Sequence, residues 1–205
     1  MENKNKVYKI GITGGIACGK SVVRRILDGL NVPTIDADEI VHDLLQFDKE
    51  VIAKIVDIFG DEITNEDGGI NRKELAKIVF PFPDKLKQLE AIIHPYTFIR
   101  INEFLDHSEK TVAAVVIPLL FETNRQKLFD SVWLITAEEY QQIERLKLRD
   151  NMSEDEAKQR IASQMPQNTK KALADVILDN SGPIENIQKQ VEDKLVEIKL
   201  LQNNS

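Results

Sequence analysis

The segment from Gly14 to Ser21 reads Gly-Gly-Ile-Ala-Cys-Gly-Lys-Ser, which matches the phosphate-binding pattern G-x-x-x-x-G-K-[ST]. Glycines let such a loop curl so that its N–H groups surround phosphate oxygens, while Lys20 neutralises the β- and γ-phosphates and Ser21 ligates Mg²⁺. The pattern follows an apolar segment and precedes apolar residues at helical spacing, so it has the required strand–loop–helix setting. We expect a bound nucleoside triphosphate; a glycine-rich turn that binds nothing is the disfavoured alternative. The residues expected to contact the nucleotide here are Gly14, Gly15, Ala17, Cys18, Gly19, Lys20, Ser21 and Val22.

Two carboxylates narrow the class of phosphate-loop protein. A GTPase would need an Asn-Lys-x-Asp motif to read guanine, and the sequence lacks one. The apolar segment that ends at Pro118 also lacks the acid that commonly closes a Walker B strand. Instead, Asp36 and Asp38 directly follow a strand-like segment, where one can serve a metal and the other an acceptor hydroxyl. This pattern favours a small-molecule kinase, although one aspartate can also cap the following helix.

Length and composition limit the number of domains and the class of protein. The 205 residues fit a single domain, and 42% hydrophobic with 30% charged residues indicates a folded chain. Cys18 is the one cysteine, which excludes an internal disulfide and a cysteine-based zinc site and favours a reducing compartment.

Charge and hydropathy limit the partners. A net charge of -7 argues against binding to nucleic acid or to an anionic membrane. The longest apolar run, Val112–Phe121, has ten residues against the roughly 20 that span a bilayer, and we see no signal peptide. We expect a cytoplasmic protein that acts as a monomer.

The elements that must position these residues alternate between strands and helices. Apolar, β-branched segments predict five strands, at Val7–Thr13, Val32–Ile35, Thr111–Ile117, Ser131–Ile135 and Asp175–Leu178. Helical spacing between them predicts a parallel sheet in a three-layer α/β/α fold. Helix starts are expected at the capping boxes Thr136-x-x-Glu139 and Ser153-x-x-Glu156, and at Asn71-x-x-Glu74. Within one domain, residues 1–205, we expect a helical substrate-binding insertion at about 60–110 and a lid at about 140–165.

Several short motifs in a fixed order resemble those of the dephospho-CoA kinase family, whose members phosphorylate the ribose 3′-hydroxyl of dephospho-CoA with ATP. Together they span nearly the whole chain. They are Thr13–Ile16 leading into the phosphate loop, Ile35–Asp38, Gly69–Arg72, His94–Pro95, Pro118–Glu122, Arg145, Arg149–Asp150, Arg160–Met165 and Asp179–Gly182.

The resemblance implies a P-loop kinase with ATP and Mg²⁺ as cofactors and dephospho-CoA as acceptor. It implies that Asp38 is the general base, that Asp36 lies near the Mg²⁺ shell, and that Arg145 and Arg149 are lid arginines that act with Lys20 on phosphate charge. It places Asn180 beside the adenine of ATP. The acceptor pocket implied by the resemblance comprises Asp38, Asn71, Arg72, His94, Leu119, Phe121 and Glu122.

Each of these assignments has a plainer alternative. The lid arginines can simply pair with Glu144 or Asp150, Asn71 can cap a helix, His94 can be an interior histidine, and the Leu-Leu-Phe run can be core. The sequence departs from the family pattern at Cys18, Val22 and His42, none of which touches an essential group.

Cys18 has two readings. A helix N-terminus and Lys20 beside it favour the thiolate and a pKa below the usual value of about 8.5, whereas free cysteines are more often buried and inert. Two functional alternatives also stay open: a P-loop kinase for another small-molecule or nucleotide acceptor, and an ATP-dependent regulatory module.

Overall fold

A computed structural model describes residues 7–203. The chain forms two compact units. One comprises Met1–Thr34 and Ser108–Ser205, and the other comprises Ile35–His107. Each unit is described by itself below.

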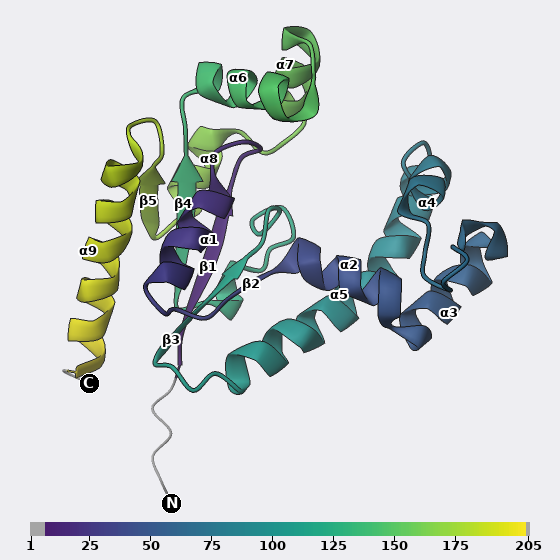
Figure 1. The fold of residues 1–205 in the computed structure, drawn as a ribbon, viewed down its shortest axis with the longest axis horizontal. Helices are drawn as coiled ribbons and strands as arrows, with labels where there is room; N and C mark the ends of the chain where they lie inside the picture. The colour runs from purple at the N-terminus through teal and green to yellow at the C-terminus, as the bar shows by residue number, and fades with distance from the viewer. Residues whose placement is uncertain (1–6, 204–205) are drawn as a thin grey trace, which may run out of the picture. The chain divides into compact units, whose positions relative to one another are not determined.

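The first unit contains a five-stranded sheet with the order β2-β3-β1-β4-β5 (Figure 1), except that the last two residues of β2 fall in the second unit. Its strands are β1 (Tyr8–Gly14), β2 (Thr34–Asp36), β3 (Val112–Val116), β4 (Ser131–Thr136) and β5 (Val176–Asp179). The central strand β1 pairs in parallel with β3 and β4, so that Ile10 lies opposite Ala114 on one side and Ser131 on the other. Every residue of β3 and β4 is buried, as in parallel sheets covered on both faces. The expectation of five strands is confirmed.

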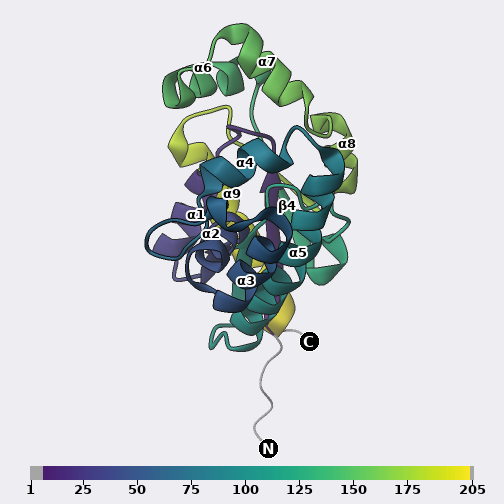
Figure 2. The ribbon, with the colours of Figure 1, turned by 90° about the vertical axis from the view of Figure 1, so that its right-hand side faces the viewer.

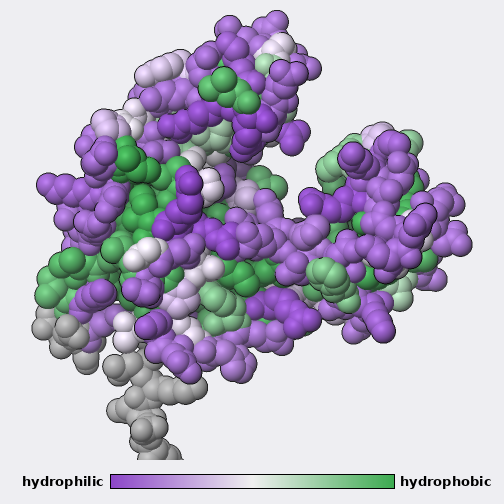
Figure 3. All heavy atoms as spheres, in the orientation of Figure 1, coloured by the Kyte–Doolittle hydropathy of each residue, from purple (hydrophilic) through white to green (hydrophobic). Residues whose placement is uncertain are grey.

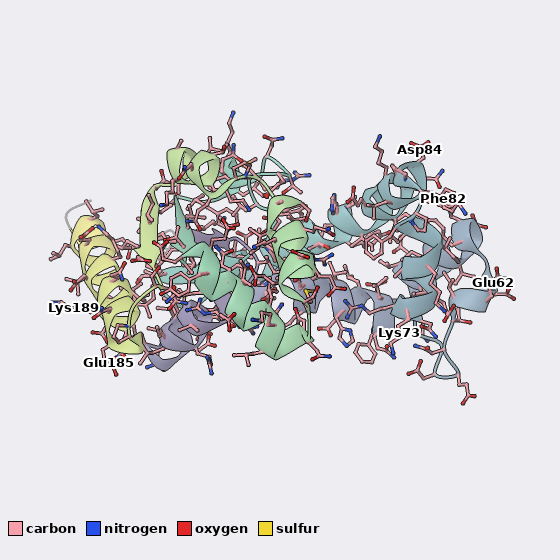
Figure 4. All side chains as sticks on the ribbon, turned by 90° about the horizontal axis from the view of Figure 1, so that it is seen from above. Glu62, Lys73, Phe82, Asp84, Glu185 and Lys189 are labelled. Atoms are coloured by element: carbon pink, nitrogen blue, oxygen red, sulfur yellow. The ribbon has the colours of Figure 1, made fainter. Side chains whose placement is uncertain are left out.

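Helices and a long loop cover the two faces of this sheet. On one face, α1 (Lys20–Gly29) and α9 (Ile184–Asn203) pack against Ile10, Ile12 and Trp133. Figure 4 shows Glu185 and Lys189 at the start of α9 pointing away from the sheet. On the other face, a Cβ on Gly11 would meet Phe129 at 2.7 Å and Leu120 at 2.9 Å, so the loop after β3 packs closely on β1. This loop contains η2 (Gln126–Leu128), and α8 (Gln167–Leu173) packs on β4 beside it. The expected three-layer α/β/α fold is thereby confirmed.

Two helices that follow β4 form a pair with its own small core. In Figures 1 and 2, α6 (Glu139–Asp150) and α7 (Glu154–Ala162) lie side by side. Ile143, Leu146 and Ala157 are buried where the two helices meet. Their outer surface is mainly hydrophilic (Figure 3), with ion pairs such as Lys147–Glu144 and Lys158–Glu154 along it. We call α6 and α7 the lid helices, after the segment expected to form a lid; that role stays a prediction.

The capping predictions have different outcomes. Ser153 accepts from the Glu156 N–H and the Glu156 carboxylate accepts from the Ser153 N–H, so this capping box is confirmed. The box expected at Thr136 is wrong, because Thr136 is the last residue of β4, paired with Asp179 of β5. Helix α6 begins at Glu139 after an N-cap residue, Glu138, that makes no side-chain cap.

The second unit, Ile35–His107, is helical. It contains α2 (Ala37–Phe47), α3 (Lys49–Phe59), η1 (Asp61–Ile63), α4 (Arg72–Val79) and α5 (Pro83–Asp106). Its core consists of buried aliphatic side chains from each element, for example Leu44, Ile55, Leu75 and Ile101. Charged residues such as Glu62, Lys73 and Asp84 point outward (Figure 4). None of the helices described between residues 7 and 203 is long and apolar enough to cross a membrane.

Candidate active site

The predicted phosphate loop connects β1 to α1. Lys20 Nζ donates to the carbonyl oxygens of Gly14 (2.8 Å) and Gly15 (3.1 Å), so the lysine curls over the loop that precedes it. Gly19 is the N-cap of α1, with φ 102° and no side-chain cap. Ser21 is exposed in the first turn. A helix N-terminus without a side-chain cap, beside a lysine and a serine hydroxyl, suits a phosphate anion.

Three consecutive loop residues are held by side chains from distant parts of the sequence. The hydrogen bonds are Ile16 N–H to Gln164 Oε1 (2.8 Å), Arg145 Nη1 to the Ala17 carbonyl (3.0 Å) and Asn180 Nδ2 to the Cys18 carbonyl (2.8 Å). Ala17 adopts a left-handed φ of 59°, which is unusual for a residue with a Cβ. These contacts hold the loop by side chains from three distant parts of the chain, and they stabilise the left-handed conformation at Ala17.

The two expected lid arginines have different surroundings. Arg145 is half-buried and bridges the carbonyls of Ala17 and Asn180, at 3.0 Å each. Arg149 is exposed and makes two hydrogen bonds to Asp150, which raise the pKa of Arg149 and lower the pKa of Asp150. Arg145 therefore lies at the phosphate loop, whereas Arg149 makes the simple surface pair that was its plainer alternative.

Asn180 serves the loop directly. Its side chain is buried. Its amide nitrogen lies only 2.0 Å from the place that a Cβ at position 19 would take, so a residue larger than glycine would clash with it. Its backbone carbonyl accepts from Arg145. Both this packing and the positive φ of Gly19 therefore favour glycine at the second glycine position of the motif.

Cys18 is buried, and burial raises the pKa of its thiol, with Lys20 opposing that shift more weakly. Its Sγ lies 3.9 Å from Gln167 Oε1. The reading of a lowered pKa is wrong, because loss of solvent around the sulfur outweighs the positive charges beside it. The buried alternative is the one that the structure supports.

The paired aspartates divide their roles. Asp36 is the N-cap of α2, and its Oδ1 accepts from the Asp38 N–H at 2.9 Å. Asp38 is exposed in the first turn of α2. One turn later on that helix, His42 Nδ1 lies 3.4 Å from Arg72 Nη1. The exposed Asp38 carboxylate therefore shares a face of α2 with the His42 imidazole, and the Arg72 guanidinium of α4 lies beside that imidazole, all within the second unit.

The predicted acceptor residues are brought together only in part. Asn71 caps α4, accepting from the N–H groups of Lys73 and Glu74, and leaves Arg72 exposed at the first helical position. His94 is half-buried on α5, one residue before Pro95.

The predicted site residues in the segment after β3 have different surroundings. Leu119 is 46% exposed, but Phe121 is 3% exposed and both Glu122 carboxylate oxygens are buried. Glu122 instead forms an ion pair with Lys170. Of these three residues, Leu119 has the most exposed side chain, Phe121 is buried, and Glu122 is held by Lys170. The assignment of Phe121 and Glu122 as acceptor contacts stays a prediction.

Two residues that contact the phosphate loop or the segment after β3 were not expected from the sequence to have a role. Gln164, which binds the Ile16 N–H, belongs to a motif that was noted without a role. Nothing in the sequence distinguished Lys170, since a lysine in a helix is ordinarily exposed. Both lie in the stretch between the lid helices and β5.

A cavity of about 660 Å³ opens in the second unit, lined by Ile40, Asp43, Phe47, Arg100 and Glu103 among others. None of the predicted site residues lines it. Among residues 7–203, no three His, Cys, Asp or Glu side chains are clustered so that they could hold a metal ion. A magnesium ion needs no such cluster, since it commonly binds one or two protein oxygens with substrate phosphates and water.

Comparison with known proteins identifies relatives over almost the full length. A model of the family described as dephospho-CoA kinase matches residues 8–186. The dephospho-CoA kinase of Shouchella clausii is 42% identical over 190 residues, which cover 91% of this chain and 96% of that protein. A solved structure of TT1252 from Thermus thermophilus has a TM-score of 0.80 at 29% identity, covering 93% of this chain and 97% of that one. A dephospho-CoA kinase from Campylobacter jejuni has a TM-score of 0.70 at 31% identity, covering 93% and 96%.

Proposed function

The chain belongs to the dephospho-CoA kinase family, and we propose that it uses MgATP to phosphorylate the ribose 3′-hydroxyl of dephospho-CoA through the residues described above. The product is coenzyme A, and the reaction is the last step of its biosynthesis. The observation that carries the assignment of ATP is the phosphate loop, with Lys20 curled over it at the N-terminus of α1. That the protein acts as a monomer remains part of this proposal.

The phosphate loop binds the triphosphate. Backbone N–H groups at the start of α1 surround phosphate oxygens, and Lys20 exchanges the carbonyls of Gly14 and Gly15 for the β- and γ-phosphates. The exposed Ser21 hydroxyl and the Asp36 carboxylate are hard oxygen donors of the kind that Mg²⁺ prefers. When bound, that ion offsets phosphate charge; Asp36 keeps one oxygen for the Asp38 N–H.

Asp38 acts on the acceptor. Its carboxylate is exposed, so it can accept the proton of the ribose 3′-hydroxyl as that oxygen attacks the γ-phosphorus, while the bond from this phosphorus to the β,γ-bridging oxygen breaks and ADP leaves. The Arg72 guanidinium, beside His42, offers donors for the pyrophosphate of dephospho-CoA. Asn71 and His94 complete this side of the proposal, and Leu119 offers the apolar surface.

Arg145 acts on the transferred group. A guanidinium has five donors, and the bonds to Ala17 and Asn180 use two of them. Arg145 can therefore hold the loop and still bind a phosphate oxygen as charge develops there. Arg149 joins it only after it exchanges Asp150 for phosphate.

The proposal is tested by two substitutions that should impair ATP binding and turnover in different ways. Lys20→Ala should weaken ATP binding and slow turnover together, since Lys20 contacts phosphate in the ground state and the transition state. Asp38→Asn should leave ATP affinity nearly unchanged and lower kcat about 10²-fold, the usual scale for a general base. Both are measured by coupled detection of ADP with dephospho-CoA as acceptor.

The matched control is Glu39→Gln, which removes the neighbouring exposed carboxylate on α2 and should keep normal kcat. Near-normal turnover of Asp38→Asn would remove Asp38 from the mechanism. A panel of nucleotides and sugars in the same assay tests the alternative acceptors, and faster turnover of any of them would overturn the assignment of dephospho-CoA.

A further inference from the structure

Lys170 is a buried charge that the reaction does not use. Its side chain is 1% exposed, and its Nζ lies 2.7 Å from Oε1 of Glu122, whose side chain is 22% exposed. The contact has the distance of an ion pair but not the angles of a hydrogen bond. Lysine is almost never this deeply buried unless it is paired, and Glu122 is the charged partner here.

The residues just before Lys170 contact the phosphate loop. Gln164 Oε1 accepts from the Ile16 N–H at 2.8 Å, and Gln167 Oε1 lies 3.9 Å from Cys18 Sγ. The Lys170 N–H donates to the Pro166 carbonyl at 3.1 Å, which makes the start of α8 continuous with these two glutamines. One short segment thus contacts the phosphate loop at one end and carries the buried lysine at the other.

Glu122, the partner of Lys170, lies in a turn held by several hydrogen bonds. Thr123 Oγ1 donates to the Leu119 carbonyl at 2.8 Å, and the Arg125 N–H donates to the Leu120 carbonyl at 3.0 Å. The start of the turn is tied to β1, because Thr13 Oγ1 donates to the Pro118 carbonyl at 3.1 Å. Glu122 is therefore a fixed point relative to the strand that leads into the phosphate loop.

An ion pair at this place defines position better than it adds stability. Apolar side chains of similar volume often stabilise a core as much as a buried ion pair does. However, apolar contacts allow the two packed elements to shift against each other, whereas two buried charges require one relative position in which they are in contact. Residues that support a binding loop in this way commonly tune its affinity without touching the ligand.

We propose that Lys170 is a positioning residue for the nucleotide site. Its ion pair with Glu122 fixes the start of α8 against the turn after β3, and Gln164 and Gln167 pass that position on to the phosphate loop at Ile16 and Cys18. The inference rests on the proposed binding of nucleotide at this loop.

The test measures ADP affinity by calorimetry and hydrogen exchange of the Ile16 amide. Lys170→Met should weaken ADP binding on the order of tenfold and speed exchange at Ile16. Lys171→Met is the matched control: it changes the adjacent, exposed lysine of the same helix and should alter neither quantity. Unchanged ADP affinity in folded Lys170→Met, with only a lower Tm, would overturn the proposal and leave a structural role.

A second comparison covers the case in which the single variant does not fold. Lys170→Met combined with Glu122→Met removes both charges, and should recover Tm while ADP affinity stays weak. Recovery of both together would mean that packing alone matters, which contradicts the proposal.

The last test measures whether Lys170 and Gln164 affect ADP binding together or independently. Because Lys170 is inferred to act through Gln164, adding Gln164→Leu to Lys170→Met should weaken ADP binding by less than the product of the two single effects. Independent effects would contradict the connection. If the wild-type chain itself fails to bind ADP, the proposed function fails, and that result is distinguishable from binding that is equal in all variants.

Discussion

Replacing Gly19 by alanine tests the packing of the phosphate loop with a single methyl group. Gly19 has φ 102°, a region that residues with a Cβ rarely adopt. The added Cβ would lie 2.0 Å from Asn180 Nδ2, the atom that donates to the Cys18 carbonyl. Two separate costs follow, one in the backbone and one in the displaced amide.

The size of the loss can be worked from these contacts. A left-handed conformation costs an alanine about 1–2 kcal/mol. Moving the Asn180 amide leaves the buried Cys18 carbonyl without its donor, which costs about 1–3 kcal/mol. We expect Gly19→Ala to lower the free energy of unfolding by about 2–5 kcal/mol.

Urea unfolding followed by circular dichroism measures this loss, and two other glycines separate its causes. Gly68 has φ 85°, and no heavy atom lies within 4 Å of the place that a methyl group there would take, so Gly68→Ala should show the backbone cost alone. Gly29 has open space and no positive φ, so Gly29→Ala should be neutral or stabilising by about 0.5–1 kcal/mol. The reasoning is refuted if Gly19→Ala costs no more than Gly68→Ala.

Three further predictions concern other parts of the site. Arg145→Ala should lower kcat about 10²-fold with little change in the affinity for dephospho-CoA, in steady-state assays; an equal loss of binding at unchanged kcat would make Arg145 a ground-state anchor. Because burial raises the pKa of Cys18, the unfolded chain loses this proton first, so wild-type stability should fall relative to Cys18→Ala as the pH rises above about 8.5. Parallel curves from pH 7 to 10, or alkylation of the folded protein, would contradict the buried thiol. Ser153→Ala should cost about 1 kcal/mol in thermal unfolding, and Ser163→Ala, at the other end of α7, should cost less; similar losses would show that the cap of α7 is not what matters.

Local patterns in the sequence predicted the features that depend on local physics. Runs of buried β-branched residues such as those of β3 predict strands, because both faces of a parallel sheet are covered. Ser153 forms its capping box because the serine and Glu156 lie within one turn of each other. The same pattern failed at Thr136, where pairing with β5 held the threonine in the sheet.

Features that depend on distant contacts could not be read from one sequence. The lysine of a helix looks exposed until its partner is known, and Glu122 lies 48 positions before Lys170 in the chain. Likewise, the shared helical face of Arg145 and Arg149 predicts a common role, yet only one of them reaches the phosphate loop. Charge and spacing name the candidates, and tertiary packing decides which of them act.

The lid helices also bear on how far the loop motif can be moved between proteins. Ile16 and Ala17 occupy positions that the motif leaves open, yet both pack against the small core formed by Ile143, Leu146 and Ala157. Separating the lid helices from the loop would bring apolar surface on both sides into water. A phosphate loop transplanted from another kinase could thus keep every defining glycine, lysine and serine and still lack the apolar side chains that pack against the lid helices. Two of the four open positions of the motif, Ile16 and Ala17, are therefore residues whose packing depends on the lid helices.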